Sequence, residues 1–424
     1  MYESFIGDWI LPFIEPFLDP AQCGGFTKSS ITHCLVKLLH FVHKHLDLKQ
    51  PHAVILDLVD LEKAFNRVFH IHVIEDLADM KVHGWLLQIL LSYLSGRSMH
   101  MRYNGATSSS RELPGSTPQG AFLGILLFLI IFNGALLRPS IPRPRNLHLN
   151  HIDDLSMLAA INIKLDILDD PLDRPMPLKF DERSRKILKP DGQLQNDLNS
   201  LHDFTSRKLL KNKEAKTCAI KFNFSKHLDF PAELKIPGFD NHISMVEETK
   251  LLGIVITSDL RWEANTSYIC RKAFKKMWIL RRLKVLDVPV DFLVDVYKKE
   301  IRSLVEIAVP AWHSGLTVKQ AEDIERVQKV AMSVILGQRM PSVEARALLG
   351  LESLHDRREI ICKRFAKKTL QSRHSDMFQK NIGSRVYPTR FKQLFYENKC
   401  NSKRYYDSPI NYLTRLLNSQ ELGS

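Results

Sequence analysis

Carboxylates that interrupt apolar, β-like sequence constrain this chain more than any other feature does. The segment AVILDLVD (53–60) is apolar and β-branched, as in a buried strand, and it ends at Asp60. The segment NLHLNHIDDLSMLAA (146–160) indicates a strand, an acidic turn at Asp153 and Asp154, and a second strand. Two carboxylates within ~4 Å repel by ~4 kcal/mol at an effective dielectric of ~20, and burying one without a partner is costly. The fold must therefore leave these acids in water or supply a cation.

A pair of divalent ions could provide this positive charge, because hard cations prefer oxygen ligands. Two ions ~3.5–4 Å apart activate a hydroxyl group for attack and stabilise a leaving pyrophosphate. Asp57 lies three residues before Asp60, so it points to the opposite face of the strand and is not expected to join the site. On the acids alone, an exposed acidic turn is the simpler interpretation.

Hydrophobic periodicity predicts an α+β domain followed by an almost entirely helical region after about residue 265. The expected helices before that point are 29–46, 71–80, 84–95 and 194–211. The expected strands are 53–61, 99–104, 217–224 and a hairpin within 250–262. Prolines exclude a helix or central strand in 138–146, and the prolines and charges of 161–192 indicate an inserted surface excursion.

One apolar run imitates a membrane span. Residues 120–137 are 18 residues without a charge, but they include Asn133 and three glycines, and no second span accompanies them. A helix that is apolar on all sides also suits the core of a large domain, so we expect a buried helix and no membrane partner. The N-terminal segment carries acids at Glu3, Asp8 and Glu15 and has no basic leader, so no signal peptide is expected.

Cysteine content and charge bear on the setting of the chain. Six cysteines, none of them in a CxxC pair, predict reduced thiols inside the cell and no zinc site. Residues 261–424 hold 31 of the 60 Lys and Arg residues but only 17 of the 47 acids, so the rest of the chain is near neutral. A basic part beside a neutral one suggests a polyanionic partner, although a solvated basic surface explains the charge equally well.

Five segments together resemble the reverse transcriptases of non-LTR (LINE-like) retrotransposons, and the resemblance covers nearly the whole chain. They follow the order of that family's motifs A to D and its primer-grip hairpin: DLEKAFNRV (60–68), LPGSTPQGAFLG (113–124), HIDDL (151–155), KNKEAKT (211–217) and LLGIVITSDLRW (251–262). Each alone is weak, whereas five in order make a specific signal. The resemblance implies a right-hand polymerase palm with partial fingers in 1–262, thumb-like helices in 263–310 and a basic helical region in 311–424.

The resemblance also implies the site residues. Asp60, Asp153 and Asp154 would be the catalytic triad that holds two Mg²⁺ ions, with Mn²⁺ as a substitute. The implied nucleotide-binding residues are Leu61, through its main-chain carbonyl, Phe65, Gln119, Gly120 and Lys216.

Each nucleotide-binding assignment has a plainer alternative. The ring of Phe65 would block a ribose 2′-hydroxyl, or it would simply pack in the core. Gln119 and Gly120 would lie against the nucleotide and template, where glycine allows close approach, or they would form only a turn. Lys216 would stand near the pyrophosphate, although nearby Lys211 and Lys213 compete for that role and a surface lysine is the alternative.

Two segments would contact nucleic acid. QCGGF (22–26) resembles the fingers segment that touches the template, which implicates Gln22, Gly24 and Gly25. RKAFKKMWILRRLK (271–284) resembles the first thumb helix, and its cations recur at one-turn spacing. Such a stripe can hold a phosphate backbone, or it can be the solvated face of an amphipathic helix. The implicated cations are Arg271, Lys272, Lys275, Lys276 and Arg282.

The implied function is RNA-directed DNA polymerisation with deoxynucleoside triphosphates on an RNA template and a DNA primer, in the nucleus or cytoplasm. Some positions depart from the family pattern, namely Asn66, Ile125 and His151. Only 21 residues precede Gln22, so we expect an N-terminally truncated copy with incomplete fingers and no endonuclease. The alternatives are a catalytically inactive nucleic-acid-binding relic and a chain that lacks a stable fold.

Overall fold

The computed structural model describes residues 2–49, 52–113, 115–117, 122–135, 146–162, 192–224, 234–381 and 394–420. These residues form two compact units. Unit 1 comprises residues 1–27, 55–219 and 226–245, and unit 2 comprises residues 28–54, 220–225 and 246–424. The Pro-rich segment 138–145, most of the expected insertion at 161–192, and both Gln119 and Gly120 lie outside the described residues.

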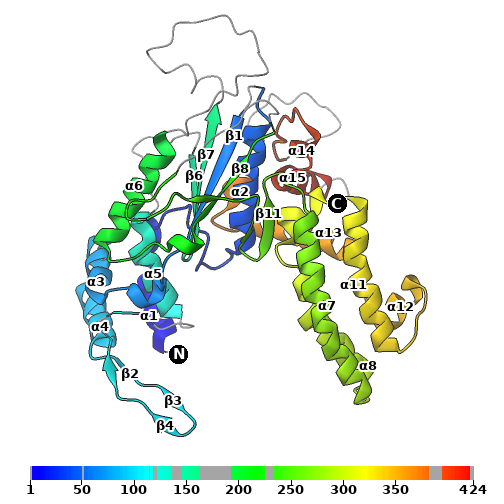
Figure 1. Ribbon diagram of the computed structural model, residues 1–424, viewed down its shortest axis with the longest axis horizontal. Helices are drawn as coiled ribbons and strands as arrows, with labels where there is room; N and C mark the ends of the chain where they lie inside the picture. Colours follow the sequence, from blue (N-terminus) through cyan, green and yellow to red (C-terminus); the bar gives the residue numbers. More distant parts are fainter. Residues whose placement is uncertain are drawn as a thin grey trace, which may run out of the picture. The chain divides into compact units, whose positions relative to one another are not determined.

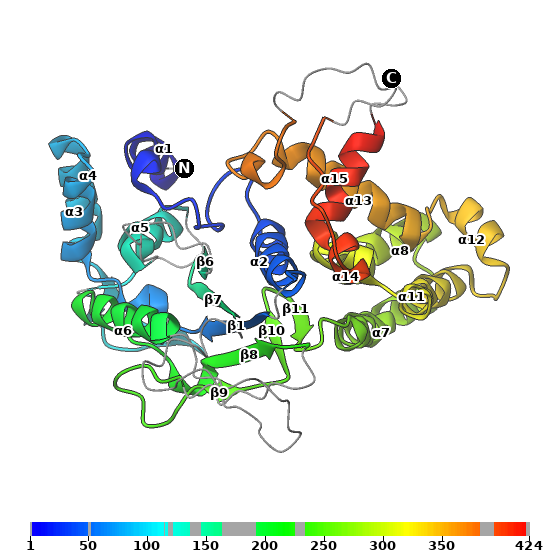
Figure 2. The same cartoon turned by 90° about the horizontal axis from the view of Figure 1, so that it is seen from above.

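A five-stranded sheet has the strand order β6–β7–β1–β8–β9 (Figures 1 and 2). Most of its residues belong to unit 1, whereas residues 52–54 and 220–222 belong to unit 2. The strands are β1 (His52–Val59), β6 (Asn146–His151), β7 (Asp154–Asn162), β8 (Cys218–Phe222) and β9 (Ser244–Met245). β6 and β7 are antiparallel, and β8 and β9 are parallel. All of β1 except its first residue is buried, as its apolar sequence predicts.

The helices of unit 1 include the apolar run that imitates a membrane span. They are α1 (Tyr2–Ile14), η1 (Glu15–Phe17), η2 (Ala64–Arg67), α3 (His70–Asp79), α4 (Gly84–Leu94), α5 (Phe122–Phe132), η3 (Asn133–Ala135), α6 (Gly192–Arg207) and η4 (Glu214–Lys216). α5 is buried along nearly all of its length and packs against α1 and α3, which confirms the expected core helix. Among the helices that the structure describes, none is both long and apolar enough to cross a bilayer.

The expected edge strand over 99–104 is replaced by two small hairpins. One pairs β2 (Ser98–Met99) with β5 (Arg111–Glu112), and the other pairs β3 (Arg102–Tyr103) with β4 (Ala106–Thr107). The chain reverses at Asn104 and Gly105, which both have positive φ and make the two-residue turn that suits antiparallel strands.

Unit 2 is mainly helical. Its elements are α2 (Ile31–Leu46), β10 (Glu248–Leu251), β11 (Ile254–Thr257), α7 (Glu263–Val285), α8 (Val290–Val296), the π-helical η5 (Tyr297–Arg302), α9 (Ser303–Val305), α10 (Val309–Trp312), η6 (His313–Gly315), α11 (Val318–Leu336), α12 (Ser342–Leu349), α13 (Leu354–Thr369), η7 (Ser375–Met377), α14 (Lys403–Tyr406) and α15 (Pro409–Gln420). The long helices α7 and α11 lie side by side (Figures 1 and 2).

The limits of the units differ from the domain limits expected from the sequence. The helix α2 and the hairpin β10–β11 belong with the C-terminal helices instead of with the palm segments. α2 belongs with these helices because it is buried on most of its sides, at 10 of its 16 residues. A helix with so much buried surface needs several neighbours, and α2 finds them in α10, α14 and α15.

Candidate active site

The acidic turn of unit 1 is the two-residue connection between β6 and β7. His151 pairs with Asp154, so Ile152 and Asp153 alone form the turn. Ile152 has a φ of 64°, in the left-handed region that β-branched residues rarely adopt. Such a backbone conformation persists only where the surrounding structure holds it.

The QCGGF segment holds this turn. The Cys23 amide donates to the Asn150 carbonyl at 2.7 Å, so the segment runs beside β6. The side-chain carbonyl oxygen of Gln22 accepts from the amides of Gly24 at 3.0 Å and of Ile152 at 3.3 Å. A Cβ on Gly24 would come within 2.7 Å of the Ile152 amide nitrogen, so only glycine fits there.

This arrangement corrects the assignment of Gln22. We expected Gln22 and Gly24 to touch a template, but Gln22 is only 2% exposed and Gly24 is buried, so neither offers a surface to one. Their described contacts support the acidic turn instead. Gly25 is half-buried with a φ of 77°, and its contact with a template stays a prediction.

Asp60 directly follows β1, and its backbone is fixed from the other side. Leu61 forms an antiparallel bridge with Asn212. On either side of this bridge the Lys213 amide donates to the Asp60 carbonyl at 2.8 Å, and the Glu62 amide donates to the Lys211 carbonyl at 2.7 Å. The segment expected to be motif D therefore pairs with the segment expected to be motif A. The role of the Leu61 carbonyl as a ligand stays a prediction.

This pairing distinguishes two of the three candidate lysines, Lys216 and Lys211. The Lys216 ammonium lies 3.6 Å from the Asp60 carboxylate, whereas the Lys211 ammonium lies 3.3 Å from Glu62. Of these two lysines, Lys216 is therefore the one at the acidic site. Its side chain is 62% exposed, so the ion pair with Asp60 adds little to stability.

The negative charge of Asp60 acts on both aspartates of the acidic turn. Burial and the negative charge of Asp60 raise the pKa of Asp153 above its usual value. Asp154 keeps an exposed side chain, yet partial burial of its carboxyl and the charges of Asp153 and Asp60 raise its pKa to about 6. Lys216 lowers both pKa values. Among the described residues, the negative charge of the group therefore exceeds what Lys216 balances.

The donor set suits a divalent cation in its chemistry. Carboxylate oxygens are the ligands that Mg²⁺ prefers, and a cation would relieve the repulsion that raises these pKa values. Across the described ranges, no three Asp, Glu, His or Cys side chains meet closely enough to hold an ion. Shared binding would therefore require the carboxylates to draw together and Asp60 to exchange Lys216 for the ion.

Phe65 lies in η2, five residues after Asp60. Its ring packs on Phe128 of α5 at 4.9 Å between centroids, and its carbonyl accepts from the Thr117 amide at 2.9 Å. The side chain is only half-buried, so one part packs in the core and another part stays accessible. Phe65 therefore packs in the core, as the alternative interpretation had it. Its role at the ribose stays a prediction, which the accessible part of the ring allows.

Asp57 is not part of this group. Its side chain is fully buried, and neither carboxyl oxygen has a hydrogen-bond partner among the residues that the structure describes. Burial raises its pKa to about 8. The alternation of the strand predicted that Asp57 points away from the site, and the burial of its side chain agrees with that prediction.

The expected nucleic-acid cations of unit 2 lie on α7. Arg271, Lys272, Lys275 and Arg282 are exposed. Lys272 also lies over the ring of Tyr268, at 5.2 Å from its centroid. Lys276 is engaged, because its ammonium lies 2.5 Å from Glu300. Their contacts with nucleic acid stay predictions.

The antiparallel hairpin β6–β7 with its acidic turn lies beside the strand β1, which Asp60 directly follows. In sequence, the chain is homologous to transposon polymerases. It is 24% identical over 302 residues to the probable RNA-directed DNA polymerase from transposon BS of Drosophila melanogaster, which covers 68% of this chain and 29% of that protein. It is 31% identical over 139 residues to the corresponding protein from transposon X-element of the same fly, which covers 31% of this chain and 14% of that protein.

The chain thus spans less than a third of the length of these relatives. No protein-family model matches it. Among solved structures it is similar to apo telomerase from Candida tropicalis, with a TM-score of 0.43 and 10% identity over 88% of this chain and 55% of that one. It is also similar to Candida tropicalis telomerase with a TWJ fragment of telomeric RNA, with a TM-score of 0.38 and 10% identity over 81% and 45%. Likeness at this level does not bear on function.

Proposed function

We propose that this chain is the polymerase core of a retrotransposon reverse transcriptase, which adds deoxynucleotides to a DNA 3′-end on an RNA template. One observation carries the proposal: Asp60 and the pair Asp153–Asp154 come from distant segments, and yet the charge of Asp60 raises the pKa of both Asp153 and Asp154, with the Lys216 ammonium 3.6 Å from Asp60. Homology to two transposon polymerases supports the same reaction.

The residues of the site divide the work. Asp60, Asp153 and Asp154 would hold two Mg²⁺ ions or, in their place, Mn²⁺. When bound, these ions supply the positive charge that favours attack by the 3′-oxygen and departure of pyrophosphate. Lys216, which Asp60 would exchange for an ion, would counter negative charge on the phosphates. The Phe65 ring excludes a ribose 2′-hydroxyl by its bulk, and Gln22 and Gly24 keep the acidic turn in position.

Primer extension tests this function. The full chain is supplied with an RNA template, a labelled DNA primer, deoxynucleoside triphosphates and Mg²⁺ or Mn²⁺. We expect Asp153→Ala to abolish incorporation. The exposed acid Asp295 on α8 provides the matched control, and Asp295→Ala should extend the primer as the wild type does. If the wild type incorporates no more than Asp153→Ala, the enzymatic proposal is lost. Salt-sensitive binding without incorporation would then indicate the inactive relic, which the homology does not favour.

A further inference from the structure

The two small hairpins that follow α4 form an arm, defined here as residues 97–112, which projects from the end of α4 (Figure 1). All residues from 98 to 112 are exposed. Three large apolar side chains of the arm lie in water, since Met99 is 54% exposed, Met101 is 70% exposed and Tyr103 is 75% exposed. A two-stranded ribbon is only marginally stable by itself, so a surface that covers these side chains would stabilise the arm.

The arm is positively charged. It contains three arginines and one acid, Glu112. Arg97, at the foot of the arm, lies over the ring of Tyr93 at 4.9 Å from the centroid. Arg111 is the cross-strand partner of Met99, so their side chains share one face of the ribbon. Arg111 is exposed and forms no ion pair with another described residue. The arm therefore presents apolar groups together with unbalanced positive charge.

A second exposed apolar surface, the α1–α4 face, is formed by Phe5, Trp9 and Trp85. The rings of Trp9 on α1 and Trp85 on α4 meet edge to face at 5.8 Å between centroids, and these side chains are 50% and 52% exposed. Phe5 lies one turn before Trp9 on the same side of α1 and is 55% exposed. Adjacent exposed aromatic side chains of this kind mark a surface that binds another protein.

The α1–α4 face is acidic. α1 contains Glu3 and Asp8 but no basic residue, and α4 has no charged residue. The carboxylate of Glu3 accepts a hydrogen bond from the Tyr93 hydroxyl at 2.5 Å. Asp8, next to Trp9, is exposed and has no ion-pair partner in the part of the chain that the structure describes. The face and the arm thus combine apolar groups with charges of opposite sign.

We propose that the arm of one copy of this chain docks on the α1–α4 face of a second copy, whose arm makes the same contact in return. Met99, Met101 and Tyr103 would pack on the exposed rings, and Arg111 would lie against Asp8. Charge determines this pairing, because contact of arm with arm would bring arginines together, whereas contact of arm with face brings opposite charges together.

The position of the arm suits a two-fold dimer. Tyr93 lies at the foot of the arm and donates to Glu3 of α1, so the arm begins beside the face of its own copy. Two reciprocal contacts can therefore form around one axis and close the assembly. Each copy would cover six large exposed side chains, three on the arm and three on the face. Stable interfaces bury about 800 Å² on each partner, which a contact of this extent can supply.

Sedimentation velocity with the full chain tests the proposal, and the wild type should sediment as a dimer in the micromolar range. The variants are Arg111→Glu on the arm and Asp8→Lys on the face. Each variant alone would have like charges at both contacts, so we expect its dimerisation to weaken about tenfold or more. In an equimolar mixture the two reversed residues meet each other, and so do the two unchanged residues. The mixture should therefore dimerise like the wild type.

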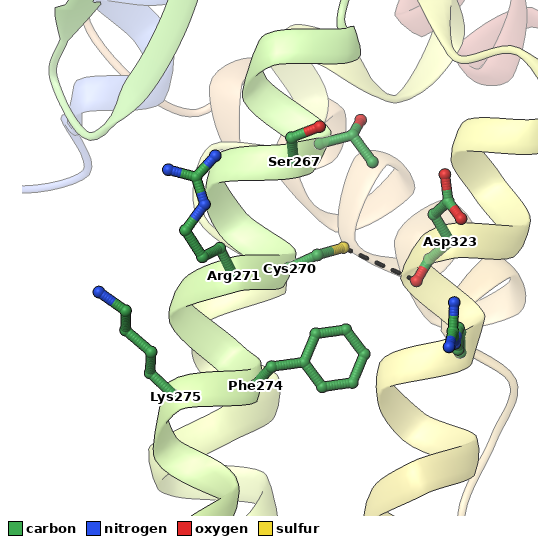
Figure 3. Close-up of a pocket in the computed structure, with 8 residues that line it drawn as sticks. Ser267, Cys270, Arg271, Phe274, Lys275 and Asp323 are labelled. Atoms are coloured by element: carbon green, nitrogen blue, oxygen red, sulfur yellow. Dashed lines mark hydrogen bonds between the residues drawn. The ribbon is translucent and has the colours of Figure 1, made fainter.

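The controls reverse exposed charges in unit 2. Asp291→Lys changes an acid beside the exposed ring of Phe292 on α8. Arg326→Glu changes a cation that lines a pocket of about 600 Å³ between α7 and α11 (Figure 3). Both controls should dimerise like the wild type, and so should Asp153→Ala, which separates this interface from the polymerase proposal.

Three results would overturn the interface. The first is a wild type that stays monomeric throughout the micromolar range. The second is dimerisation of Arg111→Glu or Asp8→Lys with the affinity of the wild type. The third is an equimolar mixture of these two variants that dimerises no better than either variant alone.

Discussion

The Gln22 side chain accepts a hydrogen bond from the Ile152 amide at 3.3 Å, across 130 positions of sequence. This contact holds a left-handed β-branched residue next to Asp153. Gln22→Ala leaves the turn without that support, so we expect primer extension to fall about tenfold and the free energy of unfolding to drop by about 1–2 kcal/mol. Extension rate and thermal melting are the measurements. Gln88→Ala, on an exposed face of α4, is the control and should change neither.

Lys216 and Asp60 give a second prediction. Lys216→Met removes the cation that lowers the pKa of both Asp153 and Asp154, and it removes the charge expected near the pyrophosphate. We expect the extension rate to fall about tenfold or more. The free energy of unfolding should fall by less than about 1 kcal/mol, because the ion pair is exposed. Lys211→Met breaks the pair with Glu62 instead and should keep most of the activity. Equal losses in the two variants would remove Lys216 from its special role.

Much of unit 1 could be predicted from the sequence, because the local sequence of its main elements specifies their secondary structure. β1, the β6–β7 hairpin and α5 are apolar runs of suitable length and spacing, and the structure has them where they were expected. The partners of those elements are not local. Nothing near Gln22 indicates that it lies against residue 152. Its neighbour Gly24 suggested a template contact, whereas in the structure Gly24 allows close packing on the turn.

The difference between local sequence and distant partners also explains why the role of Lys216 and the place of Arg326 could not be predicted. Three lysines within six residues are equivalent in sequence, and only the bridge between Leu61 and Asn212 separates Lys216 from Lys211. Arg326 is one polar residue on an amphipathic helix, and it becomes part of a pocket only because α11 lies along α7.

Asp57 predicts an unusual dependence of stability on pH. Its pKa is raised by burial to about 8, whereas an unfolded aspartate titrates near ~3.9. The folded state therefore binds the proton more tightly, and stability is lost as the pH rises from about 4 to about 8. Asp57→Asn removes this loss, so its melting temperature should rise relative to wild type between pH 5 and pH 8. The corresponding free-energy gap should grow by on the order of 2–4 kcal/mol. A gap that does not change with pH would contradict the buried, protonated carboxyl.

The histidine pair of unit 2 predicts the opposite slope. His33 and His374 stack at 4.6 Å between ring centroids, and burial followed by the charge of Lys37 lowers the pKa of His33 to about 4 and that of His374 to about 3. Since unfolded histidine titrates near ~6.5, the stability from neutral rings is present above that pH and is lost as the pH falls toward 4. At pH 5 each ring should cost about 2 kcal/mol.

Melting at pH 7 and pH 5 measures this effect. His374→Gln should narrow the difference between the two melting temperatures, and His100→Gln, at an exposed position, should leave it as in wild type. An unchanged difference in His374→Gln would show that this ring does not titrate with folding.

The most direct test of the central claim is to locate the metal ion itself. Fe²⁺ can be supplied in place of Mg²⁺ with ascorbate and peroxide, so that hydroxyl radicals cut the backbone beside the bound ion. If Asp60, Asp153 and Asp154 bind one cluster of ions, the full chain should be cut near residue 60 and near residues 152–154, and Asp153→Ala should lose both cuts together. Cutting at only one of these segments, or equal cutting in Asp153→Ala, would contradict the shared site.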